Sequence, residues 1–439
     1  MSEVNFKYEN YPNIEKSNFY LDKAKKLIPS VTQTLAKGPT QYVDGVAPKY
    51  LSKGKGAYVW DVDGNRYLDF NMGIGPISLG YCYSAVDNAI KEQLDSGITF
   101  SLMHPLEVEV AEIVQSIIPN AERVRFSKTG CDVTSAAIRL ARNYTKRDKI
   151  LSCGYHGWHD WTIGTTSKRE GIPEEYRNLT KKFNYNDFDS FYKLIDEDCA
   201  AVIMEPMLFE FPKDNFLSKI RDVCTKNGSL LIFDEMWTGF RLSLGGAQQY
   251  FGVNSDLNTF SKAVANGMPI SLLTGKAEIM DKLNEDVFFY TTFGGEALSL
   301  AAAKVTIKEM QEKKVIDHLH KLGLSLKNNL NKIIEEIGID YLECIGMGPR
   351  SMLSIKNTYC NPLLVKSFIQ QELIKNGILW QGSHSICFSH SEKDIDFTLN
   401  VYKDVLLSTD NYIKTKQIEK NIFGKPVQPV FRTITGKEK

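Results

Sequence analysis

The sequence predicts an α/β protein built around a mostly parallel β-sheet flanked by helices, together with a smaller α+β domain. Two observations predict this fold class. Short apolar runs alternate with longer amphipathic stretches over much of the chain, which is the pattern of βα units in a parallel sheet. The 439 residues, of which 43% are hydrophobic and 24% charged, are also enough for two or three globular domains.

The elements follow one another along the chain. A hairpin is expected first, in GKGAYVWDVDGNRYLDF, where Asp63, Gly64 and Asn65 supply the turn between two alternating strands. A helix is expected over 132–142, because its apolar residues fall at positions i, i+3, i+4, i+7 and i+8. The strands expected in the sheet are 123–126, 149–152, 200–204, 229–233, 257–260 and 270–274.

The second half of the chain changes character. Residues 298–332 form a long, nearly uninterrupted helical pattern, which we interpret as the exit from the sheet domain. We therefore expect residues 71–310 to form a large domain. Residues 311–439 would form a C-terminal small domain, to which an N-terminal segment, 1–70, contributes.

Charge and hydropathy exclude several classes of protein. The 53 Lys and Arg residues cancel the 53 Asp and Glu residues, whereas proteins that bind nucleic acid or acidic membranes show a basic excess. Any bound anion must therefore be held by a local site. No apolar run approaches the roughly 18 to 20 residues that cross a bilayer, and the start MSEVNFKYEN lacks a basic segment followed by an apolar one. We expect a soluble, cytoplasmic protein.

Neither disulfides nor a metal site is expected. The eight cysteines are scattered without a C-x-x-C pair, as in a chain with reduced thiols. His156 and His159 stand three residues apart, but no second pair of ligands follows at the spacing of a zinc site.

Two charged residues follow strands of the expected sheet. Asp234 comes directly after one strand, and Lys262 ends another in the same way. Ligands of parallel sheets bind outside the carboxyl ends of the strands, so both side chains would face a binding crevice. The alternative is a simple ion pair.

An anion site is expected at Thr129, Gly130 and Cys131, which lie between a strand and a helix. The first-turn amides of that helix and its dipole attract a phosphate, and Gly130 lets the backbone come close. The segment matches neither a Walker loop nor the G-x-G-x-x-G dinucleotide pattern. The alternative is an ordinary helix cap.

Two further segments contain suitable ligand groups. The turn GYHGW places Tyr155 and His156 after a strand, where an aromatic ring can stack on a flat cofactor. The segment YTTFGG, which includes Thr292, precedes a helix and can contact an anion. A surface loop with packed aromatic residues and a second helix cap are the respective alternatives.

Taken together, these features match pyridoxal 5'-phosphate, which has a phosphate, a flat ring, a ring nitrogen that pairs with a carboxylate and an aldehyde that reacts with an amine. The chain resembles a class III aminotransferase of fold type I, and within that class it is most similar to the glutamate-1-semialdehyde aminomutase-like branch. The resemblance extends over most of the chain. It runs in order through GKGAYVWDVDGNRYLDF, HPLEVEVAE, KTGCDVTSAAIRLAR, YHGWHDW, IMEPM, LLIFDEMWTGFR, SKAVANGMPI and TTFGGEALSLAAA.

The resemblance implies catalytic roles for two residues. Lys262 would form the Schiff base with the cofactor and then carry the proton between substrate and cofactor carbons. Asp234 would keep the pyridinium nitrogen protonated, so that the ring remains an electron sink.

The resemblance also implies how the cofactor is held. The phosphate would lie on the segment 129–131, the ring would stack on Tyr155 with His156 beside it, and Glu205 would lie near the ring oxygen. Thr292 would reach the phosphate of a neighbouring subunit, which implies a homodimer with shared active sites between the large and small domains.

Two contacts of the aminomutase relatives to their substrate are missing. The matching N-terminal stretch SVTQTLAKGPTQY has no arginine to pair with a substrate carboxylate, although Lys37 is a candidate replacement. A glutamate of the small-domain loop is also absent, and Ser383 and His384 occupy that region, either as substrate contacts or as solvated loop residues. Because an unpaired desolvated carboxylate is costly, glutamate 1-semialdehyde is a poor substrate candidate.

Three functions follow from these patterns. The first is an aminotransferase that moves an amino group from a small-molecule donor to a small carbonyl or sugar-like acceptor. The second is an intramolecular 2,1-aminomutase of the glutamate-1-semialdehyde type. The third is a catalytically silent protein that binds the cofactor, which the presence of both Lys262 and Asp234 disfavours.

Overall fold

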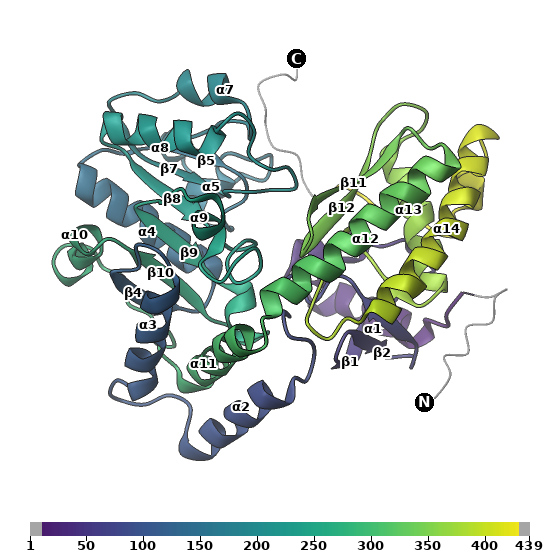
Figure 1. The fold of residues 1–439 in the computed structure, drawn as a ribbon, viewed down its shortest axis with the longest axis horizontal. Helices are drawn as coiled ribbons and strands as arrows, with labels where there is room; N and C mark the ends of the chain where they lie inside the picture. Colours follow the sequence, from purple (N-terminus) through teal and green to yellow (C-terminus); the bar gives the residue numbers. More distant parts are fainter. Residues whose placement is uncertain (1–10, 430–439) are drawn as a thin grey trace. The chain divides into compact units, whose positions relative to one another are not determined.

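A computed structural model describes residues 11–429 of the chain. These residues form two compact units (Figure 1). The large unit comprises Ser84–Ile316, and the small unit combines the first part of the chain, up to Tyr83, with the part from Asp317 onward. Within 11–429, no helix is both long and apolar enough to cross a membrane.

A seven-stranded sheet forms the centre of the large unit, in the order β4-β10-β9-β8-β7-β5-β6. β10 is antiparallel to both of its neighbours, and every other pair is parallel. The strands are β4 (Arg123–Ser127), β5 (Lys149–Cys153), β6 (Thr180–Lys182), β7 (Cys199–Met204), β8 (Leu230–Asp234), β9 (Leu257–Phe260) and β10 (Ser271–Gly275). The helices are α2 (Ser84–Ser96), α3 (Pro105–Ile117), α4 (Gly130–Thr145), α5 (Asp160–Ile163), α6 (Glu174–Asn178), α7 (Phe188–Tyr192), α8 (Phe216–Asn227), α9 (Gly246–Phe251), α10 (Ala277–Met280) and α11 (Ala297–Glu312).

Helices cover both faces of this sheet because its central strands are apolar on both sides. Successive side chains of a strand point to opposite faces. Ile203 and Ile232 pack with the apolar stripe of α4, whereas Val202 and Phe233 pack with that of α8. Buried strands of this kind read as continuous apolar runs. The strand ends are thereby held in a rigid three-layer core.

The predicted α/β class and mostly parallel sheet are confirmed. All six expected strands exist, with ends within one residue of those predicted. β6, with three residues, was not predicted. The expected helical stretch 298–332 consists of α11 and α12 (Val315–Ile337), which are separated near Lys314, where φ is +49°.

The small unit contains two further sheets. One has the order β1-β2-β3-β13, and the predicted hairpin is its β2-β3 pair, with Gly64 in the turn at φ +95°. The other has the order β11-β12-β14. The elements are α1 (Glu15–Leu27), β1 (Leu51–Lys55), β2 (Tyr58–Asp61), β3 (Arg66–Asp69), α12, β11 (Leu342–Met347), β12 (Arg350–Ile355), α13 (Pro362–Lys375), β13 (Ile378–Leu379), β14 (Ser383–Ser385) and α14 (Glu392–Lys414). Single 3-10 turns are η1 (Pro29–Val31), η2 (Leu35–Lys37), η3 (Pro39–Gln41), η4 (Lys262–Ala265), η5 (Asp281–Asn284) and η6 (Glu419–Asn421).

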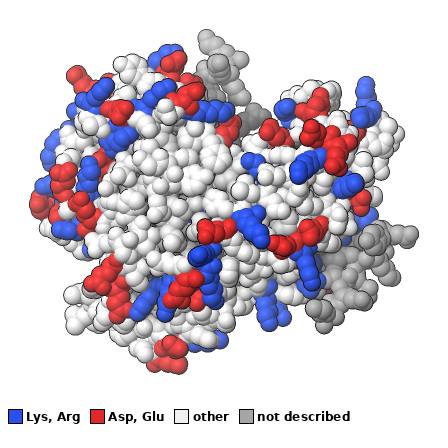
Figure 2. Space-filling model, in the orientation of Figure 1, with Lys and Arg blue, Asp and Glu red and all other residues white. Residues whose placement is uncertain are grey.

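The surface shows both signs of charge. Lys and Arg side chains lie among Asp and Glu side chains on the visible face, and no extended patch of one sign is seen there (Figure 2). This mixture agrees with the zero net charge of the sequence.

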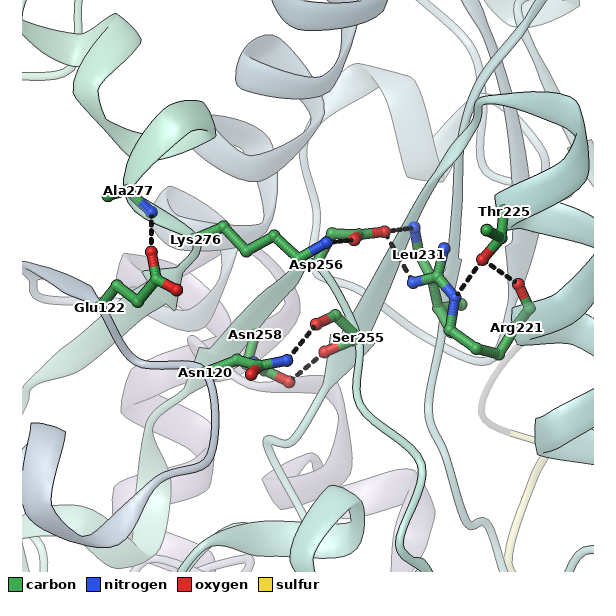
Figure 3. A network of polar contacts seen from close by, with 10 residues as sticks. All are labelled: Asn120, Glu122, Arg221, Thr225, Leu231, Ser255, Asp256, Asn258, Lys276 and Ala277. Atoms are coloured by element: carbon green, nitrogen blue, oxygen red, sulfur yellow. Dashed lines mark hydrogen bonds and ion pairs between the residues drawn. The ribbon is translucent and has the colours of Figure 1, made fainter.

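A buried carboxylate connects several elements at the edge of the sheet where β8 and β9 begin (Figure 3). Asp256, just before β9, accepts from Arg221 Nη1 at 2.7 Å, from Lys276 Nζ at 2.8 Å and from the Leu231 N–H of β8 at 2.8 Å. Burial opposes ionisation of Asp256, but the Arg221 charge and the bonds from Lys276 and Leu231 outweigh it and lower its pKa. One side chain thus fastens α8, β8 and the segment after β10.

We expect Asp256→Asn to lower the free energy of unfolding by about 2 kcal/mol or more at pH 7, because it leaves two cations without their carboxylate. Because folding lowers the pKa of Asp256, its ionised carboxylate stabilises the folded protein at pH values above the pKa that this group has in the unfolded chain. The difference between the two proteins should stay constant from pH 7 to pH 5 and shrink only below about pH 4. Urea unfolding at several pH values measures it.

Asp281→Asn is the matched control. Asp281 pairs with Arg123 at 3.0 Å, but both side chains are about half exposed, so the change should cost about 0.5 kcal/mol or less. If both variants lost the same free energy of unfolding, the Asp256 cluster would stabilise the fold no more than the pair of Asp281 with Arg123.

Candidate active site

Two strand ends of the large unit place Asp234 and Lys262 at the carboxyl edge of the sheet. Asp234 ends β8 and lies in register with Thr259 of β9. Lys262 follows β9 and adopts φ +47°, a left-handed conformation that is rare outside glycine. Its Nζ lies 3.5 Å from the ring centroid of Trp237. A strained backbone at a strand end is typical of functional positions.

Asp234 forms a buried pair with His156. The Asp234 Oδ2 and His156 Nδ1 atoms are 2.7 Å apart, and neither side chain is exposed. The other oxygen, Oδ1, accepts from the Met236 N–H at 3.1 Å. In the neutral tautomer in which His156 Nδ1 donates to Asp234, Nε2 is an acceptor. Among the residues described, this buried Nε2 has no hydrogen-bond partner.

The loop after β5 carries Tyr155 and His156. Gly154 adopts φ +110°, and the Tyr155 N–H donates to Glu205 Oε1 at 2.9 Å. The carbonyl of His156 accepts from Thr134 Oγ1 of α4 at 2.8 Å. Tyr155 remains 53% exposed, so its ring is accessible to a ligand.

The first turn of α4 begins where the anion site was predicted. Thr129 is its N-cap, and Asp132 Oδ2 accepts from the Thr129 N–H at 2.8 Å and from Ser127 Oγ at 2.8 Å. The amides of Gly130 and Cys131 lie in the first turn, where helix geometry provides no intrahelical acceptor. A Cβ on Gly130 would come within 2.8 Å of Met236 Sδ, so the turn lies close to the segment after Asp234.

Cys131, Asp132 and His159 place possible metal-ligand atoms within 4.8 Å of one another. All three side chains already have protein partners, since Cys131 Sγ lies 3.0 Å from Thr129 Oγ1. Asp132 caps α4, and His159 Nδ1 lies 2.6 Å from Ser135 Oγ. The cluster therefore belongs to the packing of the helix end.

The structure connects most of the predicted residues within the large unit. Asp234 contacts His156, Tyr155 contacts Glu205, and Cys131 lies 2.5 Å from the position of a Cβ on Gly157, next to the aromatic turn. Thr292 is exposed in the segment before α11, and among residues 11–429 no hydrogen bond links it to these residues.

Sequence patterns missed one acidic residue of this region. Glu235, next to Asp234, accepts from the amides of Ala247 and Gln248 at 2.8 and 3.1 Å and so fixes the turn that starts α9. Burial raises its pKa to about 7, although these bonds oppose the rise. The acidic pair Asp234-Glu235 at a strand end was the available signal.

One alternative of the sequence interpretation is wrong. His384 is not a solvated loop residue, since it lies in β14 and is fully buried. Its Nδ1 is 3.1 Å from Ser351 Oγ and its Nε2 is 2.7 Å from the Tyr402 hydroxyl. Burial lowers its pKa to about 3, so the ring is neutral at physiological pH.

The residues at the carboxyl edge fit pyridoxal phosphate in chemical type. A lysine amine, a buried carboxylate with accepting capacity left, an accessible phenol ring and first-turn amides are all present there. The unpartnered Nε2 of His156 indicates that a further polar group belongs in this region.

The family of the chain follows from comparison with known proteins. The family model "Aminotransferase class-III" matches residues 42–348. The chain belongs to this family. A 3-aminobutyryl-CoA aminotransferase from Cloacimonas acidaminovorans (strain Evry) is 33% identical over 406 residues, which cover 90% of this chain and 97% of that protein. A glutamate-1-semialdehyde 2,1-aminomutase from Archaeoglobus fulgidus is 33% identical over 417 residues, covering 88% of this chain and all of that protein.

Solved structures of the family have the same fold. The FumI protein of Sphingopyxis sp. MTA144, in its PLP internal aldimine form, superposes with a TM-score of 0.84 at 25% identity, over 94% of this chain and 98% of that one. The predicted class III resemblance and fold type are thus confirmed, and pyridoxal phosphate is the cofactor that the family and this structure indicate.

We expect Gly154→Ala to disturb the aromatic turn, because the new Cβ would lie 2.7 Å from Glu205 Oε1 and the backbone has φ +110°. The free energy of unfolding should fall by about 2 to 4 kcal/mol, from the combined clash and backbone strain, and the affinity for pyridoxal phosphate should fall at least about tenfold. Thermal unfolding and titration with the cofactor measure the two effects.

Gly171→Ala separates the two causes. Gly171 also has a positive φ, +87°, but no atom lies within 4 Å of the position that a Cβ would take there, so only the backbone cost of about 1 kcal/mol applies. If Gly171→Ala weakened cofactor binding as much as Gly154→Ala, the contact with Glu205 would not be the cause.

Proposed function

We propose that this protein is an aminotransferase that moves an amino group from a small-molecule donor to a small carbonyl or sugar-like acceptor, with Lys262 and Asp234 as catalytic residues. The observation that supports this most directly is the placement of the strained Lys262 and the buried Asp234–His156 pair after neighbouring strands β9 and β8. The aminotransferase among the relatives supports the same activity.

The side chains have complementary tasks in this proposal. When bound, pyridoxal phosphate supplies an electron-poor ring that stabilises negative charge on the substrate carbon. Lys262 Nζ takes up and returns the proton of that carbon. Asp234 holds a proton at the ring nitrogen, and His156 Nδ1 keeps the carboxylate oriented.

The amides of Gly130 and Cys131 would bind the phosphate at the first turn of α4, and Tyr155 would stack on the ring. Burial raises the pKa of the Tyr155 hydroxyl, with the nearby Cys131 adding to the rise, so the phenol stays neutral at physiological pH. Glu205 is proposed to lie on the side of the ring oxygen and Thr292 to reach the site of a second subunit.

An intramolecular aminomutase is the second candidate, because the relative from Archaeoglobus fulgidus is named a glutamate-1-semialdehyde 2,1-aminomutase. The missing N-terminal arginine disfavours that substrate. In the matching segment, the candidate replacement Lys37 is exposed in the 3-10 turn η2.

We expect a screen of single amino donors to change the visible absorption of the bound cofactor and to release a keto acid, as transfer requires. Lys262→Ala should keep the far-ultraviolet circular dichroism of the wild type and lose at least about 10³-fold in turnover. Borohydride treatment and peptide mapping should locate the cofactor on the Lys262 peptide of the wild type only.

Other results of these experiments would support a different function. Isomerisation of a substrate without release of a keto acid would support the aminomutase. Wild-type turnover in Lys262→Ala would exclude Lys262 as the catalytic amine, and Lys308→Ala serves as the lysine control because Lys308 is exposed on α11.

We also propose that the protein is a homodimer with shared active sites. Large apolar side chains are exposed on two segments of the large unit, at Leu102, Met103 and Val108 and at Phe288 and Phe293. Exposed apolar clusters of this kind mark interfaces between proteins. A second copy is the occupant we propose, since the predicted phosphate contact Thr292 lies in the second segment.

The two segments adjoin one another. The Ala297 N–H donates to the Ile98 carbonyl at 2.9 Å, and a Cβ on Gly295 would lie 2.7 Å from Glu107. Residues 295–297, which follow the second segment, therefore contact the stretch 98–107 that carries Leu102 and Met103.

We expect the wild type to have twice the mass of one chain by light scattering, and Met103→Glu to shift it towards the monomer, since a charge would be desolvated at the interface. Met103 is 83% exposed in the single chain, so the change should not unfold it. Tyr192→Glu, an exposed position on α7, is the control and should remain dimeric. A monomeric wild type would contradict the shared site.

A further inference from the structure

The peptide group between Gly154 and Tyr155 is held at both ends by charged side chains. Its carbonyl accepts from Lys182 Nζ at 3.1 Å, and its N–H donates to Glu205 Oε1 at 2.9 Å. The C=O of Gly154 and the N–H of Tyr155 belong to one planar unit, so the two bonds fix its position and its rotation together.

Lys182 reaches this peptide from the end of β6. It lies in register with Ser152 of β5, two residues before Gly154. Burial lowers the pKa of Lys182, whereas the neighbouring Cys153 and Glu205 raise it. A partly desolvated ammonium group makes a strong bond to a carbonyl, because both charge and low polarity favour it.

Glu205 reaches the same peptide from the end of β7. Its own N–H donates to the Cys153 carbonyl at 3.1 Å, which continues the β5–β7 ladder by one bond. Its side chain lies so close to Gly154 that any Cβ there would be 2.7 Å from Oε1. Glycine at position 154 is therefore required both by φ and by this approach.

We propose that Lys182 is a positioning residue, which acts with Glu205 to fix the Gly154–Tyr155 peptide and thereby to set the ring of Tyr155 and the ring of His156 that contacts Asp234. Lys182 does not touch the reacting atoms in this proposal. The inference rests on the proposed function for the roles of Tyr155 and Asp234, and it adds a residue that the sequence patterns did not single out.

The bonds on the other side of the turn show why Lys182 matters. The His156 carbonyl is held by Thr134, and Gly157 packs against Cys131, so the far end of the turn is anchored to α4. Without Lys182, the carbonyl of Gly154 would lose this cationic donor, while the bond from the Tyr155 N–H to Glu205 would remain. Rotation of the peptide would then move Tyr155 and His156 while the sheet stayed intact.

Lys182→Met tests the proposal, with Lys181→Met as the matched control. Lys181 is the preceding residue of β6 and is exposed, because successive side chains of a strand point to opposite sides. Lys182→Arg keeps a cationic donor and should restore part of the loss.

Two readouts are compared. We expect amide exchange in 154–158, measured by mass spectrometry with and without cofactor, to be about tenfold faster in Lys182→Met than in the wild type and unchanged in Lys181→Met. The visible circular dichroism of the bound cofactor, which reports ring orientation, should fall by about half or more in Lys182→Met only. An unaltered dichroic band, or unaltered exchange in 154–158, overturns the proposal.

The proposed aminotransferase activity is tested separately from the role of Lys182. A wild type that binds the cofactor but transfers no amino group from any donor contradicts the proposed activity, while the exchange and dichroism of the variants still decide the role of Lys182. A global change in exchange, outside 154–158, would show that Lys182 serves only the stability of the large unit and would also overturn the proposal.

Discussion

The contact between Asp234 Oδ2 and His156 Nδ1 is the interaction on which the arrangement of the site depends. Both side chains are fully buried, so water cannot replace either partner if the other moves. The two residues come from different parts of the sheet, the end of β8 and the turn after β5. Their 2.7 Å separation therefore requires that the turn be held as firmly as the strand. The close contact of Gly154 with Glu205 and the bond from Thr134 supply this restraint.

Two residues at the carboxyl edge of the large unit have positive φ, Lys262 at +47° and Gly154 at +110°. Glycine adopts such values freely, whereas the conformation of Lys262 is strained and persists only where surrounding packing over-determines it. The packing here is the three-layer core, in which α4 and α8 cover opposite faces of the sheet. At the other end of the strands, the Asp256 cluster fastens α8 and β8, so the strand ends that carry the site are held from both directions.

The sequence predicted the sheet well because its central strands are apolar on both faces. Each of these strands reads as a short, continuous apolar run, which can be recognised from the segment alone. Asp234 follows one of these runs, and its position located the carboxyl edge of the sheet. Other features depend on contacts between distant segments. The pairing of Asp234 with His156 joins residues 78 positions apart, and the burial of His384 depends on Tyr402. β6 was missed because three residues carry too little periodicity, and with it the placement of Lys182 opposite Ser152.

The charges at the predicted phosphate site explain why backbone groups must supply most of its binding. Lys128, the nearest cation in sequence, pairs with Glu296 at 2.6 Å, and burial lowers the pKa of this lysine despite that partner. Asp132 is occupied as a cap, where its negative charge is balanced by the dipole of α4. In the proposed site, the remaining attraction for a phosphate would come from the first-turn amides of Gly130 and Cys131. A neutral chain can thus hold an anion at one helix end without a basic patch, and a contact such as Thr292 from a second subunit would add a hydroxyl donor without adding charge.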